Sequence, residues 1–269
     1  MRFFKLLYQS AKLWIENDMV YYAAAFSYYA PLALIPLILI SLTMVGLIYG
    51  QEFTAQIFNA WGETLGTDLV KMLGLAVDNL TIATNSYSVP VVGIIFFSTI
   101  CLVALNVLST AFQRLRGVVE LGFINWLKRS LRSAIFIVIL QLYLIGIIAI
   151  EIFLSLIELP ASGFISQVGF GLSSVIFFSV LYRFLYSDKP SVKGSVVGGI
   201  IAAILFMGAK HAVYLTLLTT PSLNFYGAAG LILVLLIWVY ILAAILLYGA
   251  AIATTYDKIY LEEKSEKNI

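Results

Sequence analysis

The chain has 269 residues, of which 62% are hydrophobic and 11% are charged. Soluble domains carry about 25% charged residues, and so few charges cannot cover so much apolar surface in water. The composition therefore excludes a soluble enzyme, a disordered chain, a coiled coil and a disulfide scaffold, and it predicts an all-α, polytopic membrane protein.

The N-terminal residues 2–16 place charged and apolar side chains on opposite faces of a predicted helix. Lys5 and Lys12 fall on one face, whereas Phe4 and Trp14 fall on the other. This pattern is typical of an amphipathic helix that lies on an anionic membrane surface. A plain extension of the first span is the alternative, and both remain open.

Six apolar segments follow, and a spanning helix needs about 20 residues. They cover residues 19–50, 89–112, 133–158, 168–186, 195–219 and 226–254. We predict six transmembrane helices in a single membrane domain, 1–269, which ends in a charged tail over 255–269. Asp18 is expected to cap the first span, and Pro31 and Pro36 are expected to kink it.

The linker over residues 51–88 is acidic and amphipathic. It predicts one or two short helices, broken near Gly66, on the outer face of the bundle. A lid over a cavity and simple packing are both compatible with this pattern.

The basic residues predict the orientation. All sixteen Lys and Arg residues except Lys71 and Lys210 fall on one side of the membrane if there are six spans. By the positive-inside rule, both termini are then cytoplasmic. The net charge of +2 is too small to indicate a nucleic-acid-binding surface. Cys101 is the sole cysteine, which excludes intrachain disulfides.

Charged side chains inside a bilayer are costly, and they are usually paired, hydrated or functional. Lys210 and His211 lie about 22 Å along the fifth segment and Glu151 about 27 Å along the third, at about 1.5 Å per residue. A Glu151–Lys210 ion pair is compatible with these depths. Lys210 shares a helical stripe with Ser195, Gly199 and Ala203, which predicts that it faces the bundle.

These positions define a candidate substrate pathway and a candidate rim for lipid headgroups. The pathway comprises Glu151, Lys210, His211, Asn106, Arg114, Tyr214 and Tyr226. The rim comprises Arg116, Lys128, Arg129 and Arg132. For Lys210, a salt-bridged or snorkelling lysine is the structural alternative; for Asn106, it is a hydrogen bond to a neighbouring helix.

Several motifs, in order along the chain, resemble those of the YihY/BrkB-like membrane proteins. They include Ala23-Ala24-Ala25-Phe26-Ser27-Tyr28-Tyr29, Ala104-Leu105-Asn106-Val107, Phe206-Met207-Gly208-Ala209-Lys210, Trp238-Val239-Tyr240 and Leu247-Tyr248-Gly249-Ala250. The resemblance implies a six-span bacterial inner-membrane protein, linked by name to a virulence factor and formerly mislabelled ribonuclease BN. Family members often have Gly-Ala-Glu where this chain has Gly249-Ala250-Ala251, so a role for that glutamate is not expected here.

No motif indicates catalysis. HExxH, GxSxG and a phosphate-binding loop are absent from the sequence, and one histidine with scattered carboxylates predicts no metal or other cofactor. We therefore expect no enzyme, but a protein that transports or flips an anionic or amphipathic molecule, such as an envelope lipid, between helices. A non-transporting scaffold for envelope assembly and, less favoured, an intramembrane enzyme are the alternatives. Membrane lipids are the expected partners, and nucleic acid is not.

Overall fold

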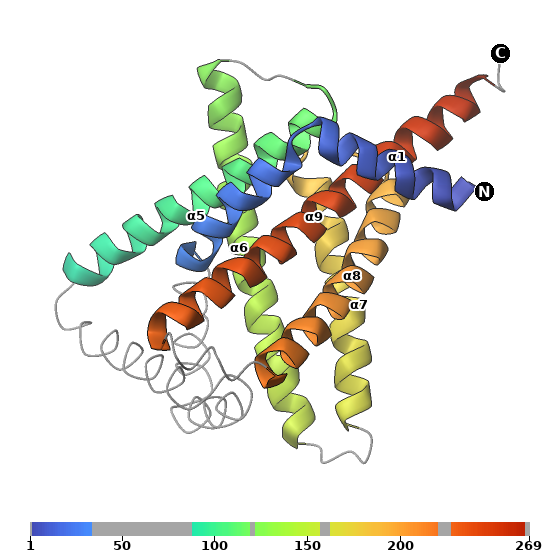
Figure 1. Ribbon diagram of the computed structural model, residues 1–269. Helices are drawn as coiled ribbons and strands as arrows, with labels where there is room; N and C mark the ends of the chain where they lie inside the picture. The colour runs from blue at the N-terminus through green and yellow to red at the C-terminus, as the bar shows by residue number, and fades with distance from the viewer. Residues whose placement is uncertain (1, 34–87, 119–121, 157–161, 220–226, 267–269) are drawn as a thin grey trace. The chain divides into compact units, whose positions relative to one another are not determined.

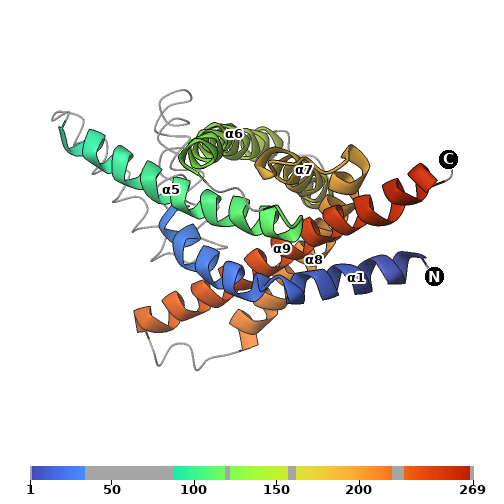
Figure 2. The ribbon, with the colours of Figure 1, turned by 90° about the horizontal axis from the view of Figure 1, so that it is seen from above.

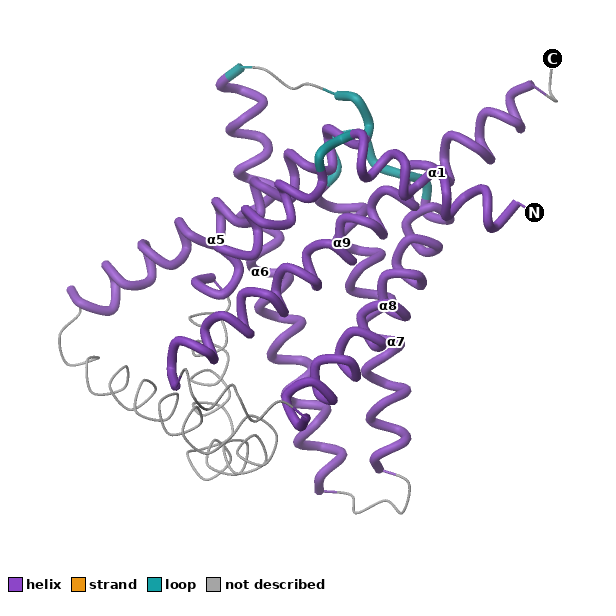
Figure 3. The backbone as a smooth tube through the Cα atoms, viewed as in Figure 1, coloured by secondary structure: helices purple, strands orange, loops and turns teal. Residues whose placement is uncertain are grey.

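The computed structural model describes residues 2–33, 88–118, 122–156, 162–219 and 227–266. Side chains are described for 3–33, 99–118, 122–146, 167–212 and 235–260. Throughout these ranges the chain forms helices joined by turns and short loops, with no strand (Figure 3). The all-helical class is therefore confirmed.

The helices follow the predicted order (Figure 1). They are α1 (Arg2–Glu16), a helix over 19–33, α5 (Ser88–Leu115), α6 (Phe123–Leu156), α7 (Ser162–Leu185), α8 (Val192–Thr219) and α9 (Gly227–Glu266). The outer linker and the second half of the first apolar segment, including Pro36, lie outside the described residues.

Four stretches of the described helices are long and apolar enough to cross a membrane. They are Phe123–Gly146, Gln167–Leu185, Val192–Ala212 and Leu235–Tyr260, and a shorter apolar stretch covers Thr99–Leu115. The molecule is thus a helical protein with several candidate membrane spans.

Two helices extend beyond the predicted segments. α6 begins at Phe123, ten residues before the predicted start at residue 133, and α9 continues through the charged tail to Glu266. Lys, Arg and Glu are good helix formers, so charged residues that mark the edge of an apolar segment do not end a helix. Gly122, with a positive φ of 109°, stands at the position where α6 begins.

The chain divides into two compact units. The first unit comprises residues 1–31, 103–136 and 167–269, and the second comprises 32–102 and 137–166. Within the described part of the second unit, the Cys101 thiol lies 3.7 Å from the Ala33 carbonyl oxygen and is buried.

In the first unit, α9 packs against both α8 and α1. α8 and α9 approach closely at Gly198 because this residue has no side chain. A Cβ atom there would overlap the carbonyl oxygen of Gly249. Beside this contact, the buried hydroxyl of Tyr182 on α7 donates to the Leu246 carbonyl oxygen at 2.9 Å. Small residues and a buried tyrosine thus set the spacing of α7, α8 and α9.

Candidate functional site

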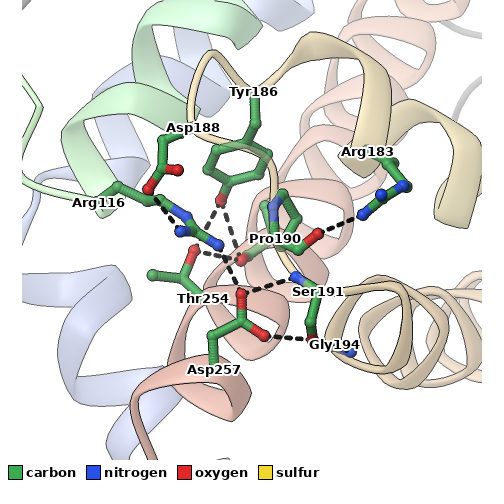
Figure 4. Close-up of polar contacts among 10 residues, drawn as sticks. Arg116, Arg183, Tyr186, Asp188, Pro190, Ser191, Gly194, Thr254 and Asp257 are labelled. Atoms are coloured by element: carbon green, nitrogen blue, oxygen red, sulfur yellow. Dashed lines mark hydrogen bonds and ion pairs between the residues drawn. The ribbon is translucent and has the colours of Figure 1, made fainter. Parts of the chain in front are cut away.

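The densest group of polar contacts in the described part of the chain surrounds Arg116, which follows α5 (Figure 4). Its guanidinium lies 2.7 Å from an Asp188 oxygen and 2.6 Å from an Asp257 oxygen. The side chains of Arg116 and Asp257 are only 14% and 11% exposed, whereas that of Asp188 is 65% exposed. We call this group, with Tyr186, Ser191 and Thr254, the Arg116 cluster.

Ser191 joins the start of α8 to α9. Its hydroxyl accepts a hydrogen bond from the Gly194 amide at 2.9 Å, which is the geometry of a helix N-cap. Its own amide and hydroxyl both donate to the Asp257 carboxylate, the amide at 2.8 Å. The carboxylate also benefits from the positive end of the helix dipole of α8.

Tyr186, against whose ring the Arg116 guanidinium lies, is fully buried. Its ring stacks on Phe112 at 4.7 Å and lies 5.6 Å from the Arg116 guanidinium carbon. Its hydroxyl lies 3.1 Å from the Ala250 carbonyl oxygen and 2.9 Å from the Thr254 hydroxyl. Burial raises the pKa of the Tyr186 phenol well above its usual value, so the hydroxyl remains a neutral donor.

The cluster connects the end of α5, the α7–α8 loop and the end of α9. Arg116 and Ser191 occupy the Asp257 carboxylate, and Arg116 also contacts Asp188, which indicates a structural role for the cluster. Sequence reasoning missed Asp188 and Asp257. The available signal was that these acids lie among basic residues at the ends of predicted spans, where each needs a partner.

Arg114 and Arg132 bind protein groups as well. Arg114 pairs with Asp18 at 2.6 Å and lies over the Tyr22 ring. Arg132 donates to the Tyr186 carbonyl oxygen at 3.0 Å and to the Ser187 hydroxyl at 2.6 Å. Asp18 directly precedes the helix over 19–33, and its carboxylate pairs with Arg114, so the expected cap stays a prediction.

Asn106, a predicted pathway residue, connects α5 to α6. Its amide nitrogen donates to the Ser130 hydroxyl at 3.3 Å, and its amide oxygen accepts from the Ser133 hydroxyl at 3.1 Å. Of the predicted rim, Lys128 is exposed and Arg129 is half-buried with an unpartnered Nε atom. Neither forms an ion pair with a described residue.

Lys210 lies apart from the Arg116 cluster. It stands inside the candidate span Val192–Ala212 and is exposed, with its ammonium 4.7 Å from the centre of the Phe170 ring of α7. It forms no ion pair with any residue whose side chain is described. His211, next to it, is exposed too.

The stripe that predicts an inward Lys210 is buried only in its first half. Ser195 and Ala203 are 1% and 2% exposed, and Gly199 is buried. Further along the stripe, Lys210 is exposed, although the Phe170 ring lies against its ammonium. Sharing a helical stripe with buried small residues is therefore not enough to bury Lys210.

The remaining pathway residues cannot be placed beside these groups. Glu151 and Tyr214 belong to α6 and α8, but their side chains lie outside the described residues, as does Tyr226 entirely. The Glu151–Lys210 pair stays a prediction. Among the described residues, no three His, Cys, Asp or Glu side chains gather as metal ligands would.

Comparisons with known proteins match the chain over nearly its full length. It is 27% identical to a UPF0761 membrane protein of Aggregatibacter aphrophilus, covering 94% of this chain and 91% of that protein. It is 25% identical to one of Haemophilus influenzae (92% and 93%) and 26% identical to one of Coxiella burnetii (88% and 88%). The comparison with solved structures found no match. The family model described as "Virulence factor BrkB" matches residues 11–268, and the chain therefore belongs to this family of membrane proteins.

Proposed function

We propose that this protein is an inner-membrane transporter that moves or flips an anionic, amphipathic molecule between its helices. In this proposal it has six spans, an amphipathic N-terminal helix outside them, and cytoplasmic termini. The observation that carries the proposal is Lys210, a cation in an apolar candidate span that has no carboxylate partner among the described side chains.

The energetics of Lys210 favour an external anion. A lysine near the centre of a spanning helix costs about 2.5–3.5 kcal/mol, and a cation over an aromatic ring recovers about 0.5–2 kcal/mol. The Phe170 ring therefore leaves part of this cost uncompensated. An anionic headgroup that docks on the exposed ammonium supplies the missing charge.

Exposed apolar side chains on the helices of Lys210 and Phe170 support an amphipathic molecule. Leu172 on α7 and Ile204 on α8 are 62% and 63% exposed, so apolar surface lies on the same two helices as the cation. An acyl chain can cover such surface while its headgroup meets Lys210. A small hydrophilic anion satisfies only the charge.

The six-span topology is supported by the places where the basic residues meet. In the first unit, Arg116, Arg132 and Arg114 all bind residues next to helix ends. This agrees with the positive-inside pattern, which assigns these linkers to the cytoplasm.

A scaffold for envelope assembly is the second candidate. The Arg116 cluster and the close contact of Gly198 with Gly249 favour it, because they hold α8 and α9 together without a ligand. A scaffold of this kind would move no lipid across the membrane.

The test is lipid flux in vesicles that contain the purified protein. Fluorescent phosphatidylglycerol in the inner leaflet becomes accessible to an impermeant quencher only if the protein moves it outward. We expect faster loss of signal than in protein-free vesicles, and several-fold slower loss for Lys210→Gln. Lys193→Gln, an exposed lysine at the other end of α8, is the matched control and should retain wild-type flux.

Equal rates in vesicles with and without protein would favour the scaffold. Equal rates for wild type and Lys210→Gln would remove Lys210 from the pathway. Flux of phosphatidylcholine as fast as that of phosphatidylglycerol would overturn the choice of an anionic substrate.

A further inference from the structure

α1 has one face against the first unit and one face uncovered. It packs beside the C-terminal half of α9 (Figures 1 and 2). Leu6 and Ser10 are 2% and 0% exposed, and the Tyr248 hydroxyl of α9 donates to the Leu7 carbonyl oxygen at 3.1 Å. These contacts fix which side of α1 points away from α9.

The uncovered face carries large apolar side chains. Phe4, Tyr8 and Ile15 are 77%, 73% and 67% exposed. At about 100° per residue, the three fall within about 40° of one another around the helix. A continuous exposed apolar stripe of this kind marks a surface that something covers, unlike single exposed apolar residues.

Two lysines border this stripe. Lys5 is exposed and has no ion-pair partner among the described residues, and Lys12 pairs only with Glu16 of its own helix, at 3.7 Å. Both side chains of the Lys12–Glu16 pair are more than half exposed, so water and salt weaken it. The two ammonium groups are therefore available to anions outside the protein.

We propose that α1 lies in the surface of an anionic lipid leaflet and anchors the N-terminal end of the protein there. Phe4, Tyr8 and Ile15 enter the boundary between headgroups and acyl chains, and Lys5 and Lys12 meet lipid phosphate groups. An apolar stripe bordered by lysines is what an interfacial helix requires. This anchor does not depend on transport.

A lipid surface fits this face better than a second copy of the chain. Two copies of α1 packed through the stripe would bring Lys5 and Lys12 of one copy towards those of the other, and like charges repel. An anionic leaflet supplies apolar contact and opposite charge together.

The experiment places one environment-sensitive fluorophore on this face. Cys101, the sole cysteine, is replaced by Ser, and the full chain carries Tyr8→Cys or, as a second position on the same stripe, Phe4→Cys. Lys189→Cys, an exposed position in the α7–α8 loop, is the matched control. Each labelled protein is placed in phosphatidylcholine vesicles with and without phosphatidylglycerol, and quenching by spin-labelled lipid and by aqueous iodide is measured.

We expect labels at Tyr8→Cys and Phe4→Cys to be quenched by spin-labelled lipid several-fold more than the control label, and to be protected from iodide. Phosphatidylglycerol should strengthen both effects, and Lys5→Gln with Lys12→Gln should abolish this strengthening. Iodide quenching as strong as at the control position would overturn the proposal. So would protection from both quenchers accompanied by cross-linking between copies, which would indicate a protein interface. Because no flux is measured, the result is separate from the fate of the transport proposal.

Discussion

Arg116 and Lys210 are both basic residues of the first unit, but their surroundings differ sharply. Arg116 contacts two carboxylates and the ring of Tyr186, and its side chain is 14% exposed. Lys210 is exposed in a candidate span, and its ammonium lies over the Phe170 ring. The protein thus neutralises Arg116 internally, whereas Lys210 has no carboxylate partner among the described side chains.

This difference is why we assign a structural role to Arg116 and propose a functional one for Lys210. A buried charge whose partners are fixed resists rearrangement, because removing one partner leaves the other uncompensated. A cation without a fixed partner can accept a passing anion and release it. Substitutions at the two places should therefore affect different properties.

The largest loss of stability is expected for Asp257→Ala. This change removes the buried partner of Arg116 and the acceptor of the Ser191 amide, and it should cost about 3–5 kcal/mol. The free energy of unfolding in mild detergent measures it. Asp188→Ala is the matched control, because this exposed carboxylate should contribute less than about 1 kcal/mol; equal losses would contradict the assignment of Asp257 as the main partner.

A smaller loss is expected for Gly249→Ala. The new methyl group would overlap the Tyr182 hydroxyl and should cost about 1–3 kcal/mol through overpacking. Gly208→Ala, where a Cβ has open space around it, should instead stabilise α8 by up to about 1 kcal/mol. Opposite shifts of the melting temperature are the expected result, and a melting temperature that Gly249→Ala leaves unchanged or raises would contradict the close packing at Gly249.

Tyr186→Phe should have a still smaller effect. It removes the hydroxyl contacts with Ala250 and Thr254 but keeps the stacking on Phe112 and the contact with Arg116, so about 1 kcal/mol should be lost. Thermal unfolding in detergent is again the measurement. A loss as large as that of Asp257→Ala would mean that the hydroxyl, and not the ion pair, holds the cluster together.

The sequence predicted the helices well and the side-chain partners poorly. Apolar segments define α5 and α8 within three residues and α7 within six, because hydrocarbon requires continuous helices. The partners of Arg116 lie 72 and 141 residues away along the chain, and nothing in the local pattern identifies them. The same limit explains Lys210: helical spacing fixes its direction on α8, but only the neighbouring helices decide whether that direction is covered.

Lys210→Gln should have the smallest effect on stability, below about 1 kcal/mol, since the contact with Phe170 is the one it loses among the described side chains. The unfolding free energies of this variant and of Lys193→Gln should therefore be nearly equal. A loss of several kcal/mol would reveal a partner that Lys210 needs for folding, with Glu151 as the first candidate.

The most direct measurement is the amount of anionic lipid that purified wild-type and variant proteins retain in a nonionic detergent, determined by native mass spectrometry. If Lys210 is open to an external anion, wild type and Lys193→Gln should retain phosphatidylglycerol, and Lys210→Gln should lose it. Equal retention by all three proteins would contradict the assignment of Lys210 as the group that binds the anion.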